Sequence, residues 1–173
     1  MANEEIFEIV DRSGRVIGRA PRSKAHGNPE LIHRSVHVLV LDPGADTENR
    51  RIFLQKRSAD KDIQPGKWDS SVGGHVAPGE NALEAAKREM SEELGIANVD
   101  LRFLYSYLWR TDVETELVSS YLCYYNGPFR ILRSEIDQGR FWSFAQIERM
   151  LASGAFTPNF EEEFSRLKNH LDE

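Results

Sequence analysis

The sequence predicts a layered domain of the α/β (α+β) class, in which strands and helices are mixed. Short apolar stretches bounded by turn residues recur along the chain, which is typical of strands. A capped helix lies between these stretches, and an apolar stripe at helical spacing marks another helix near the C-terminus. With 173 residues, 40% of them hydrophobic, and no linker or repeat, the chain is expected to form one domain over residues 1–173.

The first part of the chain is expected to be mostly strand. The expected strands cover residues 6–10, 15–19, 35–41, 51–56 and 68–72. The first two flank the turn Asp-Arg-Ser-Gly, which suggests an N-terminal hairpin. The next two are joined by the turn-rich segment DPGADTEN, and the last runs into Gly73-Gly74.

A helix is predicted between Asn81 and Gly95. Asn81 is a favourable N-cap with Glu84 three residues later, which is typical of a capping box. Gly95 is placed to take the left-handed conformation that ends many helices. At about 100° per residue, three apolar residues share one side and are expected to be buried. They are Leu83, Met90 and Leu94.

Strands and two helices are expected after this helix. The expected strands cover residues 101–109, 117–125 and 140–142. Ser143 with Gln146 begins a helix that continues through Leu151, and Asn159 with Glu162 begins another. In the last helix, apolar residues recur at spacings of four, three and four, which is the pattern of a core-facing stripe. They are Phe160, Phe164, Leu167 and Leu171.

Three carboxylates lie together on the helix between Asn81 and Gly95. Glu89, Glu92 and Glu93 stand at positions i, i+3 and i+4, so their side chains are neighbours. Like charges so placed destabilise a helix unless something neutralises them. A divalent cation does this most simply, because hard cations such as Mg²⁺ bind carboxylate oxygens and share them with substrate phosphates. The alternative is an ordinary amphipathic helix with a solvated acidic face.

Residues 74–96, GHVAPGENALEAAKREMSEELGI, resemble the Nudix box. That box is a glycine, five residues, a glutamate, seven residues, then Arg-Glu-apolar-x-Glu-Glu-x-Gly-apolar, and every fixed position is matched. The resemblance implies an α/β/α sandwich with a mixed sheet, a core over about residues 33–155, and the hairpin as an N-terminal extension. It also implies hydrolysis of a nucleoside diphosphate linked to another group, with Mg²⁺ or Mn²⁺ as cofactor.

The same resemblance implies roles for the residues of the box. The expected metal ligands are Glu89, Glu92, Glu93 and the carbonyl group of Gly74. The expected catalytic residues are Glu92, Glu89 and Arg88, and the choice of the glutamate that acts as general base is left open. Arg88 lies one turn before Glu92 and is expected to orient that carboxylate. Glu80 and Gly95 have structural roles, Glu80 by anchoring the loop onto the helix.

A narrower resemblance, from about His26 to Glu116, is to the branch of the superfamily that includes isopentenyl-diphosphate isomerase. Those isomerases hold a divalent metal with histidines and glutamates. The matching residues here are His26, His33, His75, Glu114 and Glu116. Imidazole ligands favour Mn²⁺, Zn²⁺ or Fe²⁺ over Mg²⁺, so a transition metal is expected at this candidate second site. Arg57 and Lys61 match the pair that binds the diphosphate, whereas His37 and His170 match nothing and are interpreted as structural or surface residues.

The match to the isomerases fails at one position that matters for chemistry. Their catalytic cysteine should occupy the first position of the triplet Gly73-Gly74-His75, where glycine stands. One of the two acid/base groups that would move a proton is therefore missing, and Cys123 falls on a different strand. Isomerases also carry a degenerate Nudix box. We therefore expect a hydrolase; the alternatives are an isopentenyl-diphosphate isomerase and a non-catalytic nucleotide-binding or regulatory module.

Composition limits the expected partners and location. A net charge of −6 argues against broad nucleic-acid binding. The acidic N-terminus lacks a signal-peptide layout, and no apolar run approaches the roughly 20 residues that cross a bilayer. A single cysteine, Cys123, cannot form an internal disulfide. We expect a cytoplasmic monomer or homodimer that binds a small diphosphate substrate and neither nucleic acid nor membrane.

Overall fold

The computed structural model describes residues 4–172, and its elements follow the predicted order with a few changes. The strands are β1 (Ile6–Val10), β2 (Val16–Pro21), β3 (Ile32–Leu41), β4 (Arg51–Arg57), β5 (Trp68–Asp69), β6 (Val72–His75), β7 (Arg102–Arg110), β8 (Thr115–Tyr124) and β9 (Ile136–Ser143). The helices are α1 (Arg22–Ala25), α2 (Ala82–Leu94), α3 (Phe144–Met150) and α4 (Pro158–Asp172). Residues 1–3 and 173, at the limits of the predicted domain, lie outside the described residues.

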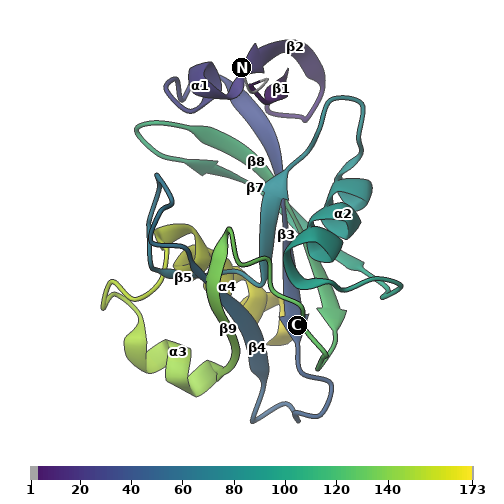
Figure 1. Ribbon diagram of the computed structural model, residues 1–173, viewed down its shortest axis with the longest axis vertical. Helices are drawn as coiled ribbons and strands as arrows, with labels where there is room; N and C mark the ends of the chain where they lie inside the picture. Colours follow the sequence, from purple (N-terminus) through teal and green to yellow (C-terminus); the bar gives the residue numbers. More distant parts are fainter. Residues whose placement is uncertain (1–3, 173) are drawn as a thin grey trace.

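Strand β3 is the centre of the sheet (Figure 1). It pairs antiparallel with β1, β4 and β6, and parallel with β8 from Ile32 opposite Thr115 to Leu41 opposite Tyr124. Its run of valines and leucines is typical of a strand that is covered on both faces. The prediction of a mixed sheet is confirmed.

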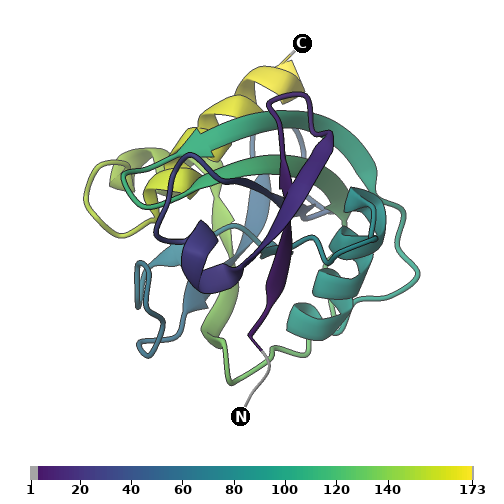
Figure 2. The same ribbon diagram turned by 90° about the horizontal axis from the view of Figure 1, so that it is seen from above.

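The side chains of β3 alternate between two hydrophobic clusters, because successive residues of a strand point to opposite faces. Val36, Val38 and Val40 pack in a cluster with the apolar side of α2. Leu39 and Leu41 pack in a second cluster with the apolar side of α4. The two helices therefore cover opposite faces of the sheet, as Figures 1 and 2 show. This is the predicted α/β/α layering.

Strands β1 and β2 with the short helix α1 form an extension over one end of β3 (Figure 1). The predicted hairpin is present, with its second strand starting one residue later than expected. Four buried apolar residues hold the extension together: Phe7, Ile9, Ala20 and Ala25. The extension therefore covers the end of β3 that carries His33.

The helix α2 has the predicted caps. The side chain of Asn81 accepts a hydrogen bond from the backbone N–H of Glu84, and the carboxylate of Glu84 accepts one from the backbone N–H of Asn81. Gly95 is left-handed, with φ of 67°. These caps satisfy backbone groups that the helix itself leaves without partners. They determine where α2 begins and ends, and so which part of the chain presents its acidic residues on a helix.

The predicted burial of Leu83 on this helix is wrong. The residue was expected to be buried with Met90 and Leu94, but it is 38% exposed and lies outside the hydrophobic clusters. Ala85 and Ala86 are buried in its place. Periodicity gives the angular position of a side chain, but it does not say whether another element lies opposite it.

Several strand and helix boundaries also differ from the predictions, and two of them have a clear local cause. The single strand expected over residues 68–72 is split into β5 and β6, because the Ser71 hydroxyl binds the backbones of Val40 and Phe53 between them. Helix α4 begins at Pro158 instead of Asn159, with the Thr157 hydroxyl accepting the backbone N–H of Phe160 at 3.2 Å. Proline suits the first position of a helix, where its missing N–H is not needed. None of the described helices has the length and apolar character to cross a bilayer.

Candidate metal and substrate site

A cavity of about 610 Å³ opens between α2, strands β3 and β6 and the N-terminal extension. Its volume lies in the usual range for small-molecule sites. Most of the predicted site residues line it: His26, Arg57, Lys61, Gly74, His75, Arg88, Glu89, Glu92, Glu93, Glu114 and Glu116. His33 is fully buried beside Glu114 and Glu116, whereas Glu80 and Gly95 do not line the cavity.

The three carboxylates of α2 lie in different environments. Glu93 is buried, and its Oε2 accepts hydrogen bonds from the Gly73 backbone N–H at 3.2 Å and from Gln55 at 3.4 Å. Burial, and then repulsion by Glu89, raises the pKa of Glu93 to about 8, so without a cation this carboxyl holds a proton near neutral pH. Burial also raises the pKa of Glu89. Glu92 faces solvent, with 55% of its side chain exposed.

Arg88 joins the loop before α2 to the acidic residues of the helix. Its Nε and Nη2 donate to the two oxygens of Glu80 at 2.9 and 3.0 Å, and Nη2 also donates to the backbone carbonyl of His75 at 3.0 Å. Its Nη1 donates to Glu89 at 2.7 Å and approaches Glu92 at 3.5 Å. Arg88 therefore orients Glu89 more closely than Glu92, which differs from the predicted role, because the two-pronged bond to Glu80 fixes the guanidinium plane.

Gly74 lies directly against the side chain of Glu89. A Cβ atom added to Gly74 would lie 2.1 Å from the Cδ of Glu89, so no other residue fits while Glu89 keeps its position. The glycine also pairs with Val36 of β3, which holds its backbone in the sheet. Gly74 therefore brings the backbone of β6 against Glu89 at the acidic end of the cavity.

Replacing Gly74 with alanine is expected to displace Glu89, destabilise the protein by about 1–3 kcal/mol and weaken Mn²⁺ binding. Thermal unfolding and titration calorimetry measure the two effects. Gly18→Ala is the matched control, because a Cβ added there meets no atom within 4 Å. Equal Mn²⁺ affinity in Gly74→Ala and the unchanged protein would contradict the assigned contact.

The predicted histidines and the Glu-x-Glu pair come together at the other end of the cavity. The closest nitrogen–oxygen distances are His26 to Glu114 at 3.3 Å, His33 to Glu116 at 3.7 Å and His75 to Glu116 at 3.7 Å. The strand register explains this meeting, because His33 of β3 lies opposite Glu116 of β8. The ligand atoms of the three histidines lie within 4.8 Å of one another, as do those of His33, Glu114 and Glu116.

Burial favours the neutral form of the histidine rings in this cluster, and three of their nitrogens have no hydrogen-bond partner. Burial lowers the pKa of His33 to about 4, and it lowers the pKa values of His26 and His75 as well. His26 Nε2 and both ring nitrogens of His33 are buried without a hydrogen-bond partner. The ring of Phe7 stacks on His33 with centroids 4.7 Å apart and closes the cluster from the extension. Such free nitrogen lone pairs are suited to a metal ion.

The two clusters differ in how closely their ligand atoms converge. Within residues 4–172, the groups of three ligand atoms that lie within 4.8 Å of one another involve the histidines, and the set Glu89, Glu92 and Glu93 is not among them. Hard cations commonly complete their ligands with water and substrate phosphate oxygens, so a more open carboxylate set suits them.

Arg57 and Lys61 both line the cavity but already have partners. Arg57 donates to Asp69 at 3.3 Å and to the carbonyl of Ile63 at 3.1 Å. Lys61 donates to Glu135 at 2.9 Å. A substrate phosphate that binds the guanidinium group of Arg57 or the ammonium group of Lys61 would therefore compete with the carboxylate already bound there.

His37 is a residue of the cavity whose role in the site sequence reasoning missed. It is buried and bound to Glu163 of α4, and it lines the cavity beside Gly73. A signal was present, because period two places His37 on the same face of β3 as His33. Glu163 likewise falls inside the apolar stripe of α4, where a lone carboxylate needs a partner. His170, in contrast, lies near the surface beside Arg102.

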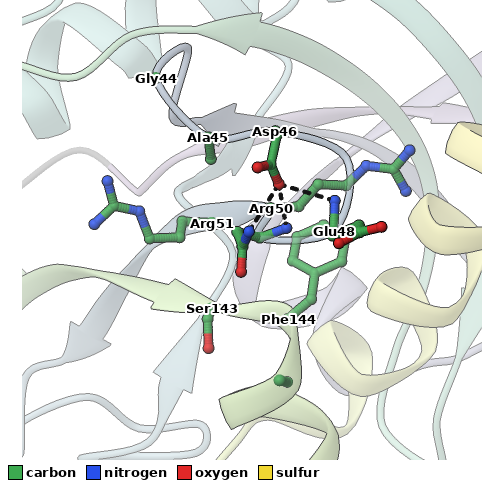
Figure 3. Close-up of a pocket in the computed structure, with 10 residues that line it drawn as sticks. Gly44, Ala45, Asp46, Glu48, Arg50, Arg51, Ser143 and Phe144 are labelled. Carbon is green, nitrogen blue, oxygen red and sulfur yellow. Dashed lines mark hydrogen bonds between the residues drawn. The ribbon is translucent and has the colours of Figure 1, made fainter.

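A second pocket, of about 480 Å³, lies between the loop that precedes β4 and the start of α3 (Figure 3). One oxygen of Asp46 accepts three hydrogen bonds from Glu48 and Asn49, which fold the loop. The pocket's two arginines are already paired, Arg50 with Asp172 and Arg51 with Asp42. None of the predicted site residues lines it.

The sequence model of the NUDIX domain matches residues 31–162. This match covers most of the chain, so the chain belongs to the Nudix family. Its similarity to Nudix hydrolases, described next, supports its classification as a hydrolase of that family.

Relatives in three bacteria illustrate the likeness. The chain is 34% identical over 134 residues to a Nudix hydrolase of Yersinia pestis. The aligned region covers 78% of this chain and 70% of the relative. The chain is 32% identical over 167 residues to a Nudix hydrolase of Streptomyces coelicolor, covering 95% and 89%. It is 40% identical over 90 residues to the isopentenyl-diphosphate Delta-isomerase of Nocardia farcinica, covering 52% of this chain and 49% of the isomerase.

Solved structures agree on the fold. The crystal structure of DR0079 from Deinococcus radiodurans matches with a TM-score of 0.79 and 22% identity, covering 94% of this chain and 98% of that one. A MutT NUDIX hydrolase from Burkholderia pseudomallei matches with a TM-score of 0.64 and 20% identity, covering 79% and 98%. These likenesses establish the fold alone.

Proposed function

We propose that this Nudix family member is a divalent-metal-dependent hydrolase that cleaves a diphosphate linkage in a nucleoside-diphosphate-type substrate. The observation that carries the proposal is that one cavity is lined by the acidic residues of α2, by most of the histidine–glutamate cluster and by the basic residues Arg57 and Lys61. A diphosphate that enters this cavity would meet two clusters of candidate metal ligands together with the side chains of Arg57 and Lys61. The family resemblance supports the same reaction class.

The residues present fit a bound cation at both clusters. Glu89, Glu92, Glu93 and the Gly74 carbonyl would hold Mg²⁺ or Mn²⁺. The histidine–glutamate cluster would hold a transition metal such as Mn²⁺, since its buried nitrogens lack partners. A bound divalent cation supplies charge stabilisation to a diphosphate and lowers the pKa of an attacking water.

The side chains of the site have separate tasks in this proposal. Glu92 is the exposed carboxylate of the three and can accept a proton from water, whereas Glu93 is enclosed and serves as a ligand. Arg88 holds Glu89 and the loop in place through Glu80. Arg57 and Lys61 bind the phosphate oxygens of the substrate by exchanging their carboxylate partners for it.

Isomerisation is the less favoured reading, because Gly73 offers no thiol where the isomerase resemblance requires one. Cys123 does not substitute for it: the residue is buried, and burial raises the pKa of its thiol to about 12. A binding module without turnover is also disfavoured, because it would have no use for so many buried carboxyl groups.

A substrate panel tests the proposal. The panel contains nucleoside diphosphates and triphosphates, nucleotide sugars, coenzymes, isoprenoid diphosphates and ADP-ribose, the ligand solved with the NUDIX domain of Shewanella oneidensis NrtR, a fold neighbour with a TM-score of 0.65. We expect release of phosphate or nucleoside monophosphate with Mg²⁺ or Mn²⁺ present and none with a chelator. Conversion of isopentenyl diphosphate to its isomer without hydrolysis of any compound would overturn the proposal.

Metal binding is expected to be stronger at higher pH, because the pKa values of about 8 for Glu93 and about 7 for Glu116 leave both carboxyls largely protonated at lower pH. A cation must displace these protons, so its affinity should fall as the pH drops from about 8 to about 6. Calorimetry with Mn²⁺ near pH 7 in two buffers of different ionisation enthalpy measures the protons released. Equal heats in both buffers would contradict the expectation.

The same groups affect the stability of the metal-free protein. The folded state keeps protons that the unfolded carboxyls lose above their ordinary pKa of 4.5. Their contribution therefore lowers stability as the pH rises from about 4.5 to about 8, and bound metal removes this penalty.

A further inference from the structure

One face of β3 changes along its length from apolar to polar. Leu39 and Leu41 pack against α4, whereas Ser35 and His37, on the same face, line the cavity. His37 lies opposite Gly73 in β6 and opposite Ser120 in β8. The same face of β3 therefore contributes leucines to the hydrophobic core and, at His37, an imidazole to the wall of the cavity.

The imidazole of His37 is held by a buried carboxylate from α4. Glu163 is fully buried and accepts hydrogen bonds from His37 Nδ1, from the Ser120 hydroxyl, from Tyr107 at 3.1 Å and from Tyr105 at 3.4 Å. Burial alone would lower the pKa of His37, but the charge of Glu163 and its hydrogen bond outweigh burial and raise that pKa well above its usual value. The pair is therefore an imidazolium and a carboxylate at neutral pH.

The second nitrogen of this ring is turned toward the cavity. Only 9% of the His37 side chain is exposed, yet His37 lines the cavity, and Nε2 has no hydrogen-bond partner among residues 4–172. A Cβ on Gly73 would lie 3.7 Å from Nε2 and 3.4 Å from Cδ2, so the missing side chain leaves this edge of the ring open. Apart from Glu163, no carboxylate within the described residues approaches either ring nitrogen to 4.0 Å.

We propose that His37 is a substrate-binding residue, whose Nε2–H donates a fixed, charge-assisted hydrogen bond to a phosphoryl oxygen of the substrate. Glu163 is the positioning residue for His37, because its carboxylate stabilises the positive charge of the imidazole and fixes the orientation of the ring before substrate binds. This inference rests on the proposed function for the class of substrate, and it adds a third basic residue to Arg57 and Lys61.

The surroundings favour a metal-bound phosphoryl group as the acceptor. Asp69 and Glu116 also face this part of the cavity and influence His37 through their charge. They repel a free anion, whereas a phosphoryl group that carries a cation with it brings compensating positive charge. Arg57 and Lys61 must give up their carboxylate partners, Asp69 and Glu135, to bind phosphate. His37 gives up nothing, since Glu163 occupies only Nδ1.

Nitrogen NMR of the whole protein labelled with ¹⁵N-histidine tests the proposal without turnover. The probe is methylenediphosphonate with Mg²⁺, because it resembles a diphosphate and is not hydrolysed. His37 is one of five histidines and is assigned by comparison with the folded double variant His37→Gln/Glu163→Gln. We expect both His37 nitrogens to be protonated before addition, and Nε2 to shift in a saturable way on addition. His170 is the internal control, expected to stay unchanged.

A double variant gives the second measurement, because His37→Gln alone leaves Glu163 buried without its cation and can unfold the protein. His37→Gln/Glu163→Gln removes both charges and retains polar atoms for Tyr107 and Ser120. With its thermal unfolding checked, it should bind the probe about 10- to 100-fold more weakly, while His170→Gln binds it normally. Once a substrate is known, the loss should appear in kcat/KM.

The two results are independent of whether hydrolysis is found. A His37 Nε2 signal that ignores the probe, or equal probe affinity in a folded double variant, overturns the assignment of His37. Failure of the substrate panel with a normal His37 response overturns only the proposed hydrolysis.

Discussion

Replacing Glu93 with glutamine is expected to lower kcat for diphosphate hydrolysis by about 100- to 1,000-fold, as loss of a metal-binding carboxylate does. The enclosed carboxyl is isosteric with the amide, and it already holds a proton without metal. The fold of the metal-free protein should therefore be unaffected. Steady-state kinetics on the best substrate of the panel, with thermal unfolding of the metal-free protein, measure both effects.

The matched control is Glu84→Gln, which makes the same change on the same helix. Glu84 is exposed and closes the capping box, a role that glutamine also fills. We expect near-normal kcat for this variant. Full activity of Glu93→Gln would show that the acidic side of α2 is not the catalytic metal site.

Replacing His75 with glutamine is expected to remove transition-metal binding at the histidine–glutamate cluster. An amide is a poor substitute for a neutral imidazole, so Mn²⁺ affinity at this site should fall by at least about 100-fold. At saturating Mn²⁺ the unchanged protein gains stability from each bound ion, roughly 2.7 kcal/mol at a concentration of 100 times Kd. The variant should lose one binding site in calorimetry and part of the rise in Tm.

His170→Gln is the control for this experiment, because His170 lies far along α4 and contacts Arg102 instead of the cluster. It should bind the same number of Mn²⁺ ions as the unchanged protein. If His75→Gln also keeps that number and the full rise in Tm, the convergence of these side chains has no role in metal binding.

Much of the fold could be predicted because local signals and tertiary contacts agree. The caps at Asn81 and Gly95 appear where the sequence places them, since capping depends on residues a few positions apart. Leu83 and the split between β5 and β6 could not be predicted in this way. The exposure of Leu83 depends on what lies opposite the helix, and the split depends on a hydroxyl that bonds to two other strands.

In the candidate site, too, the features set by local spacing could be predicted and those set by distant packing could not. Fixed spacing within the Nudix box brings Glu89 and Glu93 to one cavity, and register within the sheet brings His33 to Glu116. The contact of His37 with Glu163 joins residues 126 positions apart, and neither has a motif around it. Pairing over such a distance follows from the packing of α4 on β3, which sequence periodicity alone does not reveal.

Anomalous scattering from crystals soaked in Mn²⁺ and methylenediphosphonate tests most directly whether the acidic side of α2 holds a cation against a diphosphate. We expect a manganese peak within coordination distance of Glu89 and Glu93, with phosphonate oxygens as further ligands. A saturated diphosphonate with no manganese peak beside these glutamates would contradict it.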